Sequence, residues 1–566
     1  MNIQIKRSID SDQISDEEIV SFLLHDRGIS DKKEFFSPLH PFDILFSDLF
    51  PHSALDKVLK KLHQIRDKNE MIVVYTDYDA DGITGGAILW ETLHLLGFNV
   101  MPYVPHRKHE GYGFSKKGID AVKKQFNPRL IISVDHGISA GSTITYAKNL
   151  GIPIIVTDHH MKSSSSPDDA YAVFHTDTLS GSGVAYFFAK ETFKKLKIKN
   201  QKLKVILEKN FKVDYLALAT IGTIADLVSL TGVSRSIVKH GLDVFSDIKR
   251  VGILHILQEA GIAHKPITPY EIGFIIAPRI NAVGRIRHAI DALRLLCTTQ
   301  DARAFHLAHA IGDINKERKD LVEKAFEEAE EKIKNKKLKI KNQKIIFLTS
   351  YHWHEGIIGL IASRIAEQYY RPTIVITVSD GFAKASARSI PGFDITSFLR
   401  SHAQYLIDVG GHKAASGFTI ETSQINQFMK KILKSADELI SEKILTRTYT
   451  ADMKLPFTRA TLSFIKLIEK LAPFGVGNPR PTFYQEGVLK AISYFGKKKE
   501  HAKIYVDNGY EVILFGKRAH LLGYSKGQKI CILYSLDINR WGGKEEVRMK
   551  GVAVFPVLET KKMIDE

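Results

Sequence analysis

Short apolar runs alternate with longer segments of helical spacing through the first third of the chain. The runs at 71–77, 99–105, 129–135 and 153–158 have the length and composition of buried strands. The segment at 85–97 repeats its apolar residues at helical spacing and ends in glycine. Alternating strands and helices favour a parallel sheet with helices on its faces, and ligands bind such sheets at the carboxyl ends of the strands. We therefore predict an α/β domain here.

The rest of the chain divides by pattern into further regions. Residues 1–65 form a mixed lead-in that we expect to be helical, and the α/β domain then occupies 66–300. Alternating charge among helix formers predicts a long connecting helix within 301–343. A second α/β domain is expected at 344–442, and short strands separated by turns at 443–566 favour a small β-barrel. The predicted fold class is α/β: two lobes with parallel sheets, joined by the long helix, with an active site in the cleft between them and a β-barrel at the end of the chain.

Length and composition narrow the class of protein. A chain of 566 residues is too long for one core, and 44% hydrophobic with 25% charged residues is ordinary for a soluble globular protein. The sequence has no apolar run of about 18 residues and no apolar segment after its first basic residues, so we expect no membrane partner and a cytoplasmic location. Cys297 and Cys531 lie outside any CxxC pair, which leaves a zinc site or a disulfide framework without support.

The charge of the chain favours a polyanionic partner. Lys and Arg number 80 and Asp and Glu number 63, for a formal net charge of +17. Because each neutralised phosphate releases counterions, such an excess suits nucleic acid. Many basic proteins bind no nucleic acid, so the charge supports this function only together with other features.

The strongest local motif is DYDADG, from Asp77 to Gly82. A DxDxDG run is also typical of an EF-hand calcium loop, whose twelfth position holds a bidentate Glu. Counted from Asp77, the twelfth residue is Ile88, and a β-like run precedes the motif where an EF-hand has a helix. The sequence therefore favours a carboxylate cluster at a strand end. Alternate residues of an extended segment point the same way, so we expect Asp79 and Asp81 to face one site.

Three further acidic segments follow. Asp135 closes the run at 129–135, Asp158 closes the next run directly before His159 and His160, and Asp226 lies inside an apolar stretch. Each alone has a structural explanation, as a helix N-cap, a packed histidine or a satisfied core carboxylate. Because a buried carboxylate is costly unless it is paired or binds metal, the four segments together predict a metal site. Oxygen and imidazole ligands suit Mn²⁺, with Mg²⁺ as a substitute, and two ions sharing a carboxylate would suit in-line displacement at a phosphate.

The segments DYDADG, VDHG, TDHH and IADL resemble motifs I to IV of the DHH phosphoesterase superfamily. The resemblance implies two metal ions, Mn²⁺ or Mg²⁺, in each active site. One ion would be held by Asp79 and Asp135. The ligands of the other ion would be Asp81, Asp135, His159 and Asp226. Asp77 and His160 would support these ligands or contact the substrate.

Further segments resemble one branch of that superfamily, the RecJ exonucleases. They are PHRKHEGYG (105–113), APRINAVGRI (277–286), WHEGIIGLIASRIAE (353–367), ASARSIPGFDI (385–395), GGHKAASGF (410–418), APFGVGNPRP (472–481) and INRWGG (538–543). The resemblance covers roughly residues 65–550 and implies a DHH catalytic domain, a DHHA1 domain and an OB-fold. It departs at Ala277, where many relatives carry Gly, and in the Lys-rich 332–344, neither of which touches the metal motifs.

The resemblance also assigns phosphate contacts, for which arginine is suited because its guanidinium binds phosphate through two hydrogen bonds. Contacts to the scissile phosphate would come from His160, Arg279 and His412. A terminal 5′ phosphate, whose recognition would give 5′-to-3′ polarity, would be held by Arg107, Ser386 and Arg388. The alternative for each arginine is a structural ion pair.

Single-stranded DNA is the substrate that the resemblance implies, with a role in DNA repair and recombination. Single-strand-binding protein and a helicase are the implied protein partners, and the expected state is a monomer. Candidate stacking residues of the barrel are Tyr505, Phe515, Tyr534 and Trp541, although aromatic residues in β-domains are more often core. Two other functions stay open at this point: hydrolysis of a cyclic dinucleotide or pyrophosphate, and a scaffold without catalysis. The net charge of +17 and the barrel disfavour a small substrate, and the complete set of metal-ligand candidates disfavours a scaffold.

Overall fold

The computed structural model describes residues 2–7, 14–110, 113–162, 165–196, 198, 200–335, 343–507, 509–516 and 521–557. The chain forms two compact units. The first unit consists of Leu24–Glu317 and Leu471–Pro479. The second unit consists of Met1–Leu23, Arg318–Lys470 and Arg480–Glu566. All four acidic segments therefore belong to the first unit.

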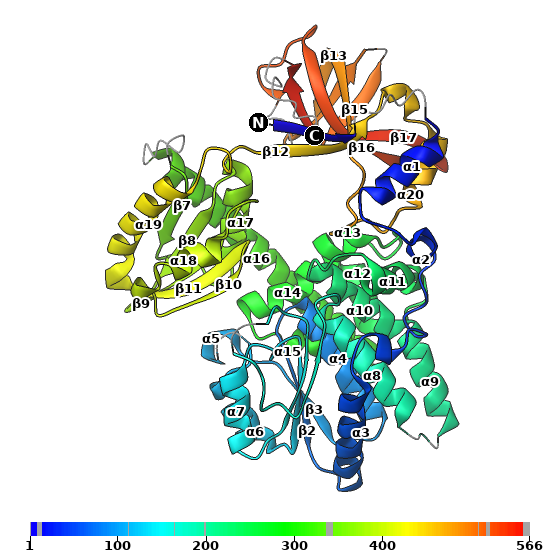
Figure 1. Cartoon of the computed structure of the whole chain (residues 1–566), viewed down its shortest axis with the longest axis vertical. Coiled ribbons are helices and arrows are strands. Elements are labelled where there is room, and N and C mark those ends of the chain that lie inside the picture. The colour runs from blue at the N-terminus through cyan, green and yellow to red at the C-terminus, as the bar shows by residue number, and fades with distance from the viewer. Residues whose placement is uncertain are drawn as a thin grey trace. The chain divides into compact units, whose positions relative to one another are not determined.

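A five-stranded parallel sheet forms the centre of the first unit (Figure 1). Its strands, in spatial order, are β3 (Val100–Tyr103), β2 (Ile72–Thr76), β4 (Leu130–Val134), β5 (Ile154–Asp158) and β6 (Ala172–His175). β2, β4 and β5 are buried at every position. The register pairs Thr76 with Val134 and Val134 with Thr157, so these three strands end at the same level of the sheet. The four predicted strands are confirmed, and β6 adds a fifth.

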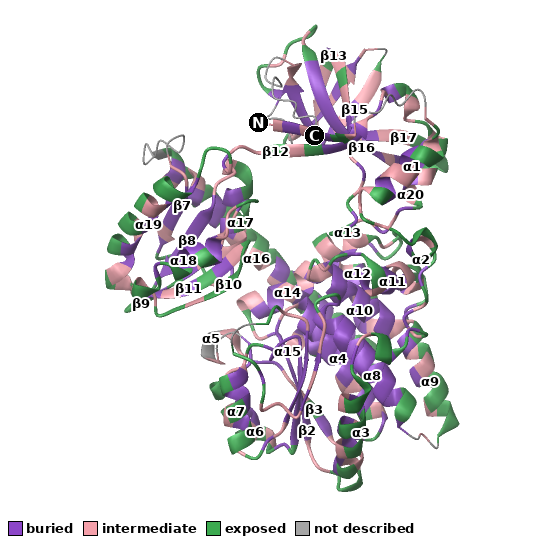
Figure 2. Ribbon diagram, viewed as in Figure 1, coloured by how far each residue is buried: buried purple, intermediate pink, exposed green. Residues whose placement is uncertain are grey.

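Different helices cover the two faces of this sheet, because alternate residues of each strand point to opposite faces. On one face, Val73 packs in a cluster with α6 (Lys116–Phe126) and α7 (Gly141–Asn149). On the other, Val74 packs in a cluster with α4 (Ala80–Leu95) and α8 (Gly181–Lys195). α10 (Asp214–Ala225) contacts both α4 and α8, and Figure 2 shows these three helices buried over most of their length.

The first unit contains further helices before, between and after the strands of its sheet. They are α2 (Lys32–Phe36), η2 (Phe46–Asp48), α3 (His52–Asp67), α5 (Arg107–Glu110), α9 (Gln201–Lys212), α11 (Gly232–Asp243), η3 (Val244–Ser246), α12 (Val251–Glu259), α13 (Pro269–Glu271), the π-helical turn η4 (Ile272–Ile276), α14 (Ala277–Ile286) and α15 (Ile290–Cys297).

A buried arginine fastens two distant segments to α11. Arg235 is 1% exposed and donates hydrogen bonds to the carbonyls of Phe35, at 2.9 Å, and of Leu471 and Ala472, at 3.2 and 2.7 Å. Its guanidinium also lies 3.6 Å from the centre of the Phe35 ring. Carbonyls cannot neutralise the arginine charge, but several of them satisfy its donors in an interior without water. Residues 471–479 therefore belong to the first unit although the chain on both sides belongs to the second.

The second unit contains an α/β lobe whose sheet is mixed. Its strands, in spatial order, are β10 (Asp408–His412), β11 (Ala415–Glu421), β9 (Phe382–Arg388), β8 (Thr373–Val378) and β7 (Ile346–Ser350). β7 and β8 pair in parallel, and the other three pairs are antiparallel. The α/β class is confirmed, but the purely parallel pairing expected for this lobe is corrected. Three residues join β8 to β9 and two join β10 to β11, too few for the crossover that parallel strands need.

Helices and a barrel complete the second unit. The helices are α1 (Asp16–His25), α17 (Ile358–Tyr369), α18 (Ile395–Arg400), η6 (Ala403–Tyr405), η7 (Thr422–Gln424), α19 (Ile425–Leu439), η8 (Phe457–Arg459) and α20 (Leu462–Glu469). The strands of the barrel region are β12 (Thr448–Lys454), β13 (Phe483–Phe495), β14 (His501–Val506), β15 (Tyr510–Leu514), β16 (Lys529–Trp541) and β17 (Lys544–Pro556). β13 pairs with both β14 and β16, which closes the ring. Among the stacking candidates, Tyr534 is buried and Phe515 is 46% exposed, while the Trp541 side chain lies outside the described residues.

The start of the predicted helical lead-in differs from expectation, whereas the predicted connecting helix is present. Residues expected in a helical lead-in form β1 (Asn2–Arg7), which pairs in parallel with β12. Its partner lies near the other end of the chain, so no local pattern indicates the pairing. The connecting helix is α16 (Asp301–Asn335), and the residues after it, 336–342, lie outside the described part. Among the described residues, no helix is long and apolar enough to cross a membrane.

Replacing Arg235 by Met should lower the unfolding temperature of the first unit by on the order of 5 °C. The loss of four hydrogen bonds, including a fourth to the carbonyl of Pro473, leaves buried carbonyls without donors and costs about 3 kcal/mol. Differential scanning fluorimetry measures the shift, and Lys434→Ala, which removes an exposed cation of the second unit, is the control. Limited proteolysis should also cleave the variant faster within 471–479. Unchanged melting and unchanged cleavage would show that Arg235 does not fasten this segment.

Candidate metal centre

Three neighbouring strands each deliver an aspartate to the same edge of the parallel sheet. Asp77 follows β2, Asp135 follows β4, and Asp158 is the last residue of β5. Because these strands end in register, the three side chains lie at adjacent positions on the edge where such sheets bind ligands. The chain turns sharply after β4, with φ of 66° at Asp135 and 117° at Gly137. Asp tolerates the left-handed region better than most residues, and Gly adopts it without strain.

Asp79 and Asp81 lie at the start of α4 and not in an extended segment. Asp79 is the N-cap, and its Oδ1 accepts hydrogen bonds from the N–H groups of Asp81 and Gly82, both at 3.0 Å. The N–H of Ala80 donates to Asn281 Oδ1 at 2.7 Å. The premise that alternate strand residues direct Asp79 and Asp81 to one site is therefore wrong. Asp79 caps the first turn of α4 and Asp81 lies within that turn, and both are candidate metal ligands.

Helix starts and glycines bring Asp81 and Asp135 close together. Asp81 accepts hydrogen bonds from the N–H groups of Gly181, at 2.6 Å, and Ser182, at 3.0 Å, at the start of α8. A Cβ atom on Gly181 would lie 2.4 Å from Asp135 Oδ1, and one on Gly222 would lie 2.3 Å from Asp81 Oδ1. Any larger residue at either position would displace a carboxylate.

His159 lies among three carboxylates. Its Nε2 is 3.2 Å from Asp135 Oδ1, 3.3 Å from Asp226 Oδ2 and 3.9 Å from Asp81 Oδ2. Within the described part of the chain, His159 Nε2 and Asp135 Oδ1 are among the few buried polar side-chain atoms that make no hydrogen bond. Buried polar atoms are almost always satisfied in folded proteins, so a ligand atom of this kind indicates a place for a cation.

Asp158 and His160 form a hydrogen-bonded pair beside His159. Asp158 Oδ1 lies 2.8 Å from His160 Nδ1, and Oδ2 accepts a hydrogen bond from the N–H of Ile138, also at 2.8 Å. Burial opposes the charged form of Asp158, but these hydrogen bonds and the charge of His160 lower its pKa below the usual range. Burial likewise opposes the cationic form of His160, but the bond to Asp158 and the nearby carboxylates raise its pKa to about 9. The pair is therefore ionic near neutral pH.

The candidate ligand atoms form three groups, each with its atoms within 4.8 Å of one another. The groups are Asp77, Asp79 and Asp135; Asp135, His159 and His160; and Asp81, His159 and Asp226. Asp135 and His159 each belong to two groups, so ions at neighbouring positions would share ligands. The donors are carboxylate oxygens and imidazole nitrogens, which fit Mn²⁺ or Mg²⁺.

Crowding of the carboxylates opposes their ionisation. Burial and the charge of Asp79 raise the pKa of Asp77 to about 7. Burial and the charges of Asp81 and Asp79 raise the pKa of Asp226 to about 8. Burial and the charges of Asp81 and the other acids raise the pKa of Asp135 well above its usual range. A divalent cation would relieve this repulsion, because it restores the ionised form of every ligand.

The alternative explanation of Asp226 was a satisfied carboxylate in the apolar core. Asp226 does not lie in that core. It caps the C-terminus of α10, and its side chain is 30% exposed. The C-terminal end of a helix carries partial negative charge, so a carboxylate is unfavourable there without a cation nearby. Its position is thus better explained by metal binding than by packing.

Arg107 and Arg279 lie in the same unit as the acidic residues, and each has a partner. Arg279 Nε is 2.6 Å from Glu259 Oε2, and its Nη1 donates to the carbonyl of Ile275 at 2.9 Å. The Arg107 guanidinium lies 5.3 Å from the centre of the Tyr78 ring, next to Asp77 in sequence. The structural alternative for Arg279, an ion pair, is therefore realised in this state of the protein.

The other predicted phosphate contacts lie in the second unit. Arg388 Nη1 donates to Ser386 Oγ at 2.9 Å, and its Nε donates to Ser363 Oγ at 3.1 Å. A Cβ atom on Gly359, at the start of α17, would lie 2.9 Å from Arg388 Nη2 and 3.1 Å from Ser386 Oγ. Ser386 and Arg388 therefore meet at a helix start. His412 is exposed at the end of β10, after Gly411 with φ of 143°.

Residues that shape the cluster were not all predicted as site residues. Asp158 orients His160, Asn281 binds the first turn of α4, and Gly181 and Gly222 leave room for the carboxylates. Asp158 had a signal, since it ends an apolar run directly before the two histidines. Asn281 and the glycines had none, because their roles depend on contacts with segments far away in sequence.

Three family models match the chain. The DHH family, N-terminal domain, matches residues 71–223, the DHHA1 domain matches 342–442, and the RecJ OB domain matches 451–551. The single-stranded-DNA-specific exonuclease RecJ of Bacillus subtilis (strain 168) is 31% identical over 561 residues, which cover 96% of this chain and 69% of that protein. RecJ of Escherichia coli (strain K12) is 28% identical over 536 residues, covering 89% and 91%.

Solved structures are similar over nearly the whole chain. A crystal structure of RecJ in complex with Mn²⁺ from Thermus thermophilus has a TM-score of 0.80 at 26% identity, covering 98% of this chain and 79% of that one. The complex with Mg²⁺ from the same organism has a TM-score of 0.74 at 25% identity, covering 98% and 78%. The ions in these two complexes are the two that the donor atoms of the cluster fit.

Replacing Asp135 by Asn should raise the unfolding temperature of the metal-free protein, because one charge leaves the crowded cluster. A carboxyl group whose pKa rises on folding weakens stability as pH increases from its unfolded pKa to its folded pKa. The advantage of the variant should therefore be small near pH 5 and reach about 3 °C near pH 8. Differential scanning fluorimetry in EDTA measures it, with the exposed Asp380→Asn as the control. Added Mn²⁺ should stabilise the wild type more than the variant, and a variant that melts below the wild type in EDTA would contradict the account.

Proposed function

The chain belongs to the RecJ family of single-stranded-DNA-specific exonucleases, and we propose that the cluster around Asp135 is where it hydrolyses the end of a single DNA strand. The enzyme is a metal-dependent hydrolase with Mn²⁺ or Mg²⁺ as its cofactor. The observation that carries the proposal is the convergence of four acidic segments on one edge of a sheet, with ligand atoms at metal-binding distances. Membership of this family replaces the small-substrate hydrolase and the scaffold as explanations.

Two ions per active site account best for the shared ligands. The first ion would be held by Asp79 and Asp135, with Asp77 beside them. The second ion would be held by Asp81, His159 and Asp226, which form one of the groups, together with Asp135, whose Oδ1 lies 3.2 Å from His159 Nε2. When bound, the two ions polarise the phosphodiester and activate the attacking water. Asp135 would be the shared ligand, because it lies in one group with Asp79 and in another with His159.

The chain orients these ligands before substrate arrives. The N–H groups of Gly181 and Ser182 direct Asp81, and the N-cap bonds direct Asp79. Asp158 holds one ring nitrogen of His160, so the imidazole has a defined orientation from which to donate to the scissile phosphate. Arg279 is a further contact to that phosphate, which requires exchange of its bond to Glu259.

A terminal 5′ phosphate binds at Ser386 and Arg388 of the second unit. The support is that the hydroxyl and the guanidinium meet at the start of α17, where Gly359 has no side chain to displace them. A guanidinium and a helix N-terminus are both complementary to a phosphate dianion. Capture of that end gives the enzyme 5′-to-3′ polarity.

Each expected domain has a different role in binding or cleaving the DNA strand. A DHH domain at 66–300 carries the metal centre, the helix of 301–343 connects it to a DHHA1 domain at 344–442, and an OB-fold at 443–566 binds the strand further from its end. The net charge of +17 favours that contact. The enzyme acts as a cytoplasmic monomer in DNA repair and recombination, with single-strand-binding protein and a helicase as partners.

Asp135→Ala should reduce the rate of strand degradation by about a thousandfold or more, because the shared ligand is lost. The assay uses a single-stranded oligonucleotide labelled separately at each end, with Mn²⁺ or with EDTA. The wild type should release the 5′ label first and only with the metal. Asp380→Ala is the matched control and should leave the rate unchanged. Release of the 3′ label first would refute the polarity, and undiminished cleavage by Asp135→Ala would refute the site.

Arg388→Ala should remove most of the preference for 5′-phosphorylated over 5′-hydroxyl strands, a change of about tenfold in relative kcat/KM. Arg364→Ala removes another guanidinium of the same lobe, one that pairs with Glu323, and should preserve the preference. The two substrates are compared in competition, so that variation in active enzyme cancels. Equal losses on both substrates would mean that Arg388 supports the fold and not the end phosphate.

A further inference from the structure

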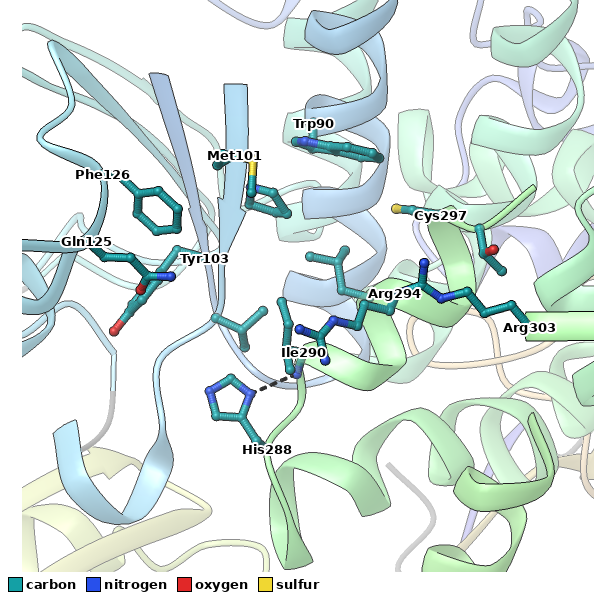
Figure 3. A pocket seen from close by; sticks show the side chains of 14 residues that line it. Trp90, Met101, Tyr103, Gln125, Phe126, His288, Ile290, Arg294, Cys297 and Arg303 are labelled. Carbon is teal, nitrogen blue, oxygen red and sulfur yellow. Dashed lines mark hydrogen bonds between the residues drawn. The ribbon is translucent and has the colours of Figure 1, made fainter. Parts of the chain in front are cut away.

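A pocket lies beside the edge strand of the parallel sheet, and none of the candidate metal ligands lines it (Figure 3). It has a volume of about 680 Å³ and is lined from β3, the later part of α4, the end of α6, α15 and the start of α16. All these segments belong to the first unit. Pockets of several hundred cubic ångströms are typical of small-molecule sites.

One side of the pocket is apolar, aromatic and rigid. The Trp90 ring lines it together with Met101 and Pro102 of the edge strand. Trp90 Nε1 donates to the carbonyl of Val100 at 3.2 Å, and its ring stacks on His94 at 5.3 Å with an interplanar angle of 12°. The indole therefore has a defined position before any ligand binds, which lowers the entropic cost of binding.

The other side of the pocket carries positive charge. Figure 3 shows Arg303 extending from the start of α16 toward Arg294 of α15. The lining residues include these two arginines and no carboxylate. Arg294 is bound to Asp291 at 2.8 Å, but both side chains are about half exposed, and such pairs contribute little and exchange readily. For Arg303, no ion pair occurs among the described residues.

We propose that this pocket binds a nucleotide, with the base against Trp90 and the Met101–Pro102 surface and the phosphate on Arg294 and Arg303. A flat aromatic ring with an anionic group at one end is the ligand that an aromatic wall and paired guanidiniums complement. The pocket itself follows from the structure, whereas the choice of a nucleotide, the product class of the enzyme, rests on the proposed function. Trp90 and the ligand Asp79 mark two points of one helix about 16 Å apart, so the pocket is distinct from the metal centre.

The proposal is tested by isothermal titration calorimetry on the full chain in the presence of Mn²⁺. The titrants are dAMP, deoxyadenosine and inorganic phosphate. We expect dAMP to bind about tenfold or more tightly than either fragment, because only dAMP engages both sides. The double variant Arg294→Ala/Arg303→Ala should lose about tenfold in affinity for dAMP. The double variant Arg129→Ala/Arg287→Ala, which removes two exposed arginines of the same unit, should lose none. Equal binding of dAMP to both double variants would overturn the proposal, as would equal binding of dAMP and deoxyadenosine.

Two further sets of measurements distinguish binding at this pocket from binding at the nuclease site. Binding of dAMP should persist in Asp135→Ala and in Arg388→Ala, so failure of the proposed nuclease function would leave this result intact. In the wild type dAMP should quench tryptophan emission, whereas Trp90→Phe should keep the affinity and lose the quenching. The Arg294→Ala/Arg303→Ala variant should degrade single strands at the wild-type rate. A loss of that rate relative to the control double variant would assign the pocket to the DNA path and overturn its separate role.

Discussion

Repulsion among the carboxylates around Asp135 is the constraint on which the rest of the first unit depends. Asp77, Asp79, Asp81 and Asp135 are gathered with Asp226 in a largely buried space, and the pKa values of several of them rise in consequence. Such an arrangement is unfavourable for folding unless the surrounding structure enforces it and a cation compensates it. The enforcement is visible in the register of β2, β4 and β5, which ends three strands at one level.

Backbone dipoles compensate part of the negative charge of the carboxylates. The ligand atoms that receive no hydrogen bond from the protein remain available to metal. The starts of α4 and α8 donate N–H groups to Asp79 and Asp81, and helix starts carry partial positive charge. Asp226 has the opposite environment, since it lies at the C-terminal end of α10. The network thus satisfies some carboxylates through the protein and leaves His159 Nε2 and Asp135 Oδ1 without hydrogen bonds. This division explains why the cluster selects a divalent cation with mixed oxygen and nitrogen donors.

The same unit holds arginine charges in two further environments, one buried and one exposed. Arg235 is buried without a carboxylate, and backbone carbonyls from two distant segments satisfy its donors. Arg294 and Arg303 keep their charges at the surface of an aromatic pocket, where a mobile anion can reach them. In the first case the positive charge serves the connection between chain segments, and in the second it is available for a ligand. Burial and the kind of acceptor, more than the residue type, decide which role an arginine has.

Local patterns in the sequence were sufficient for the strands of the first sheet, for the long helix and for the acidic segments. Apolar runs that end in Asp77, Asp135 and Asp158 are short-range signals, and the failure of the EF-hand count at Ile88 is also local. Tertiary structure alone decided that residues 2–7 pair with β12, that the second lobe has a mixed sheet, and that Asp79 and Asp81 sit on a helical turn. Tertiary structure also decided that Asn281 binds the first turn of α4 and that Gly181 and Gly222 leave room for the carboxylates. The pocket at Trp90 likewise exists only in the folded chain. The physical reason is that periodicity reports which face of an element is buried, whereas a site is made by contacts between elements whose sequence separation leaves no trace in either segment.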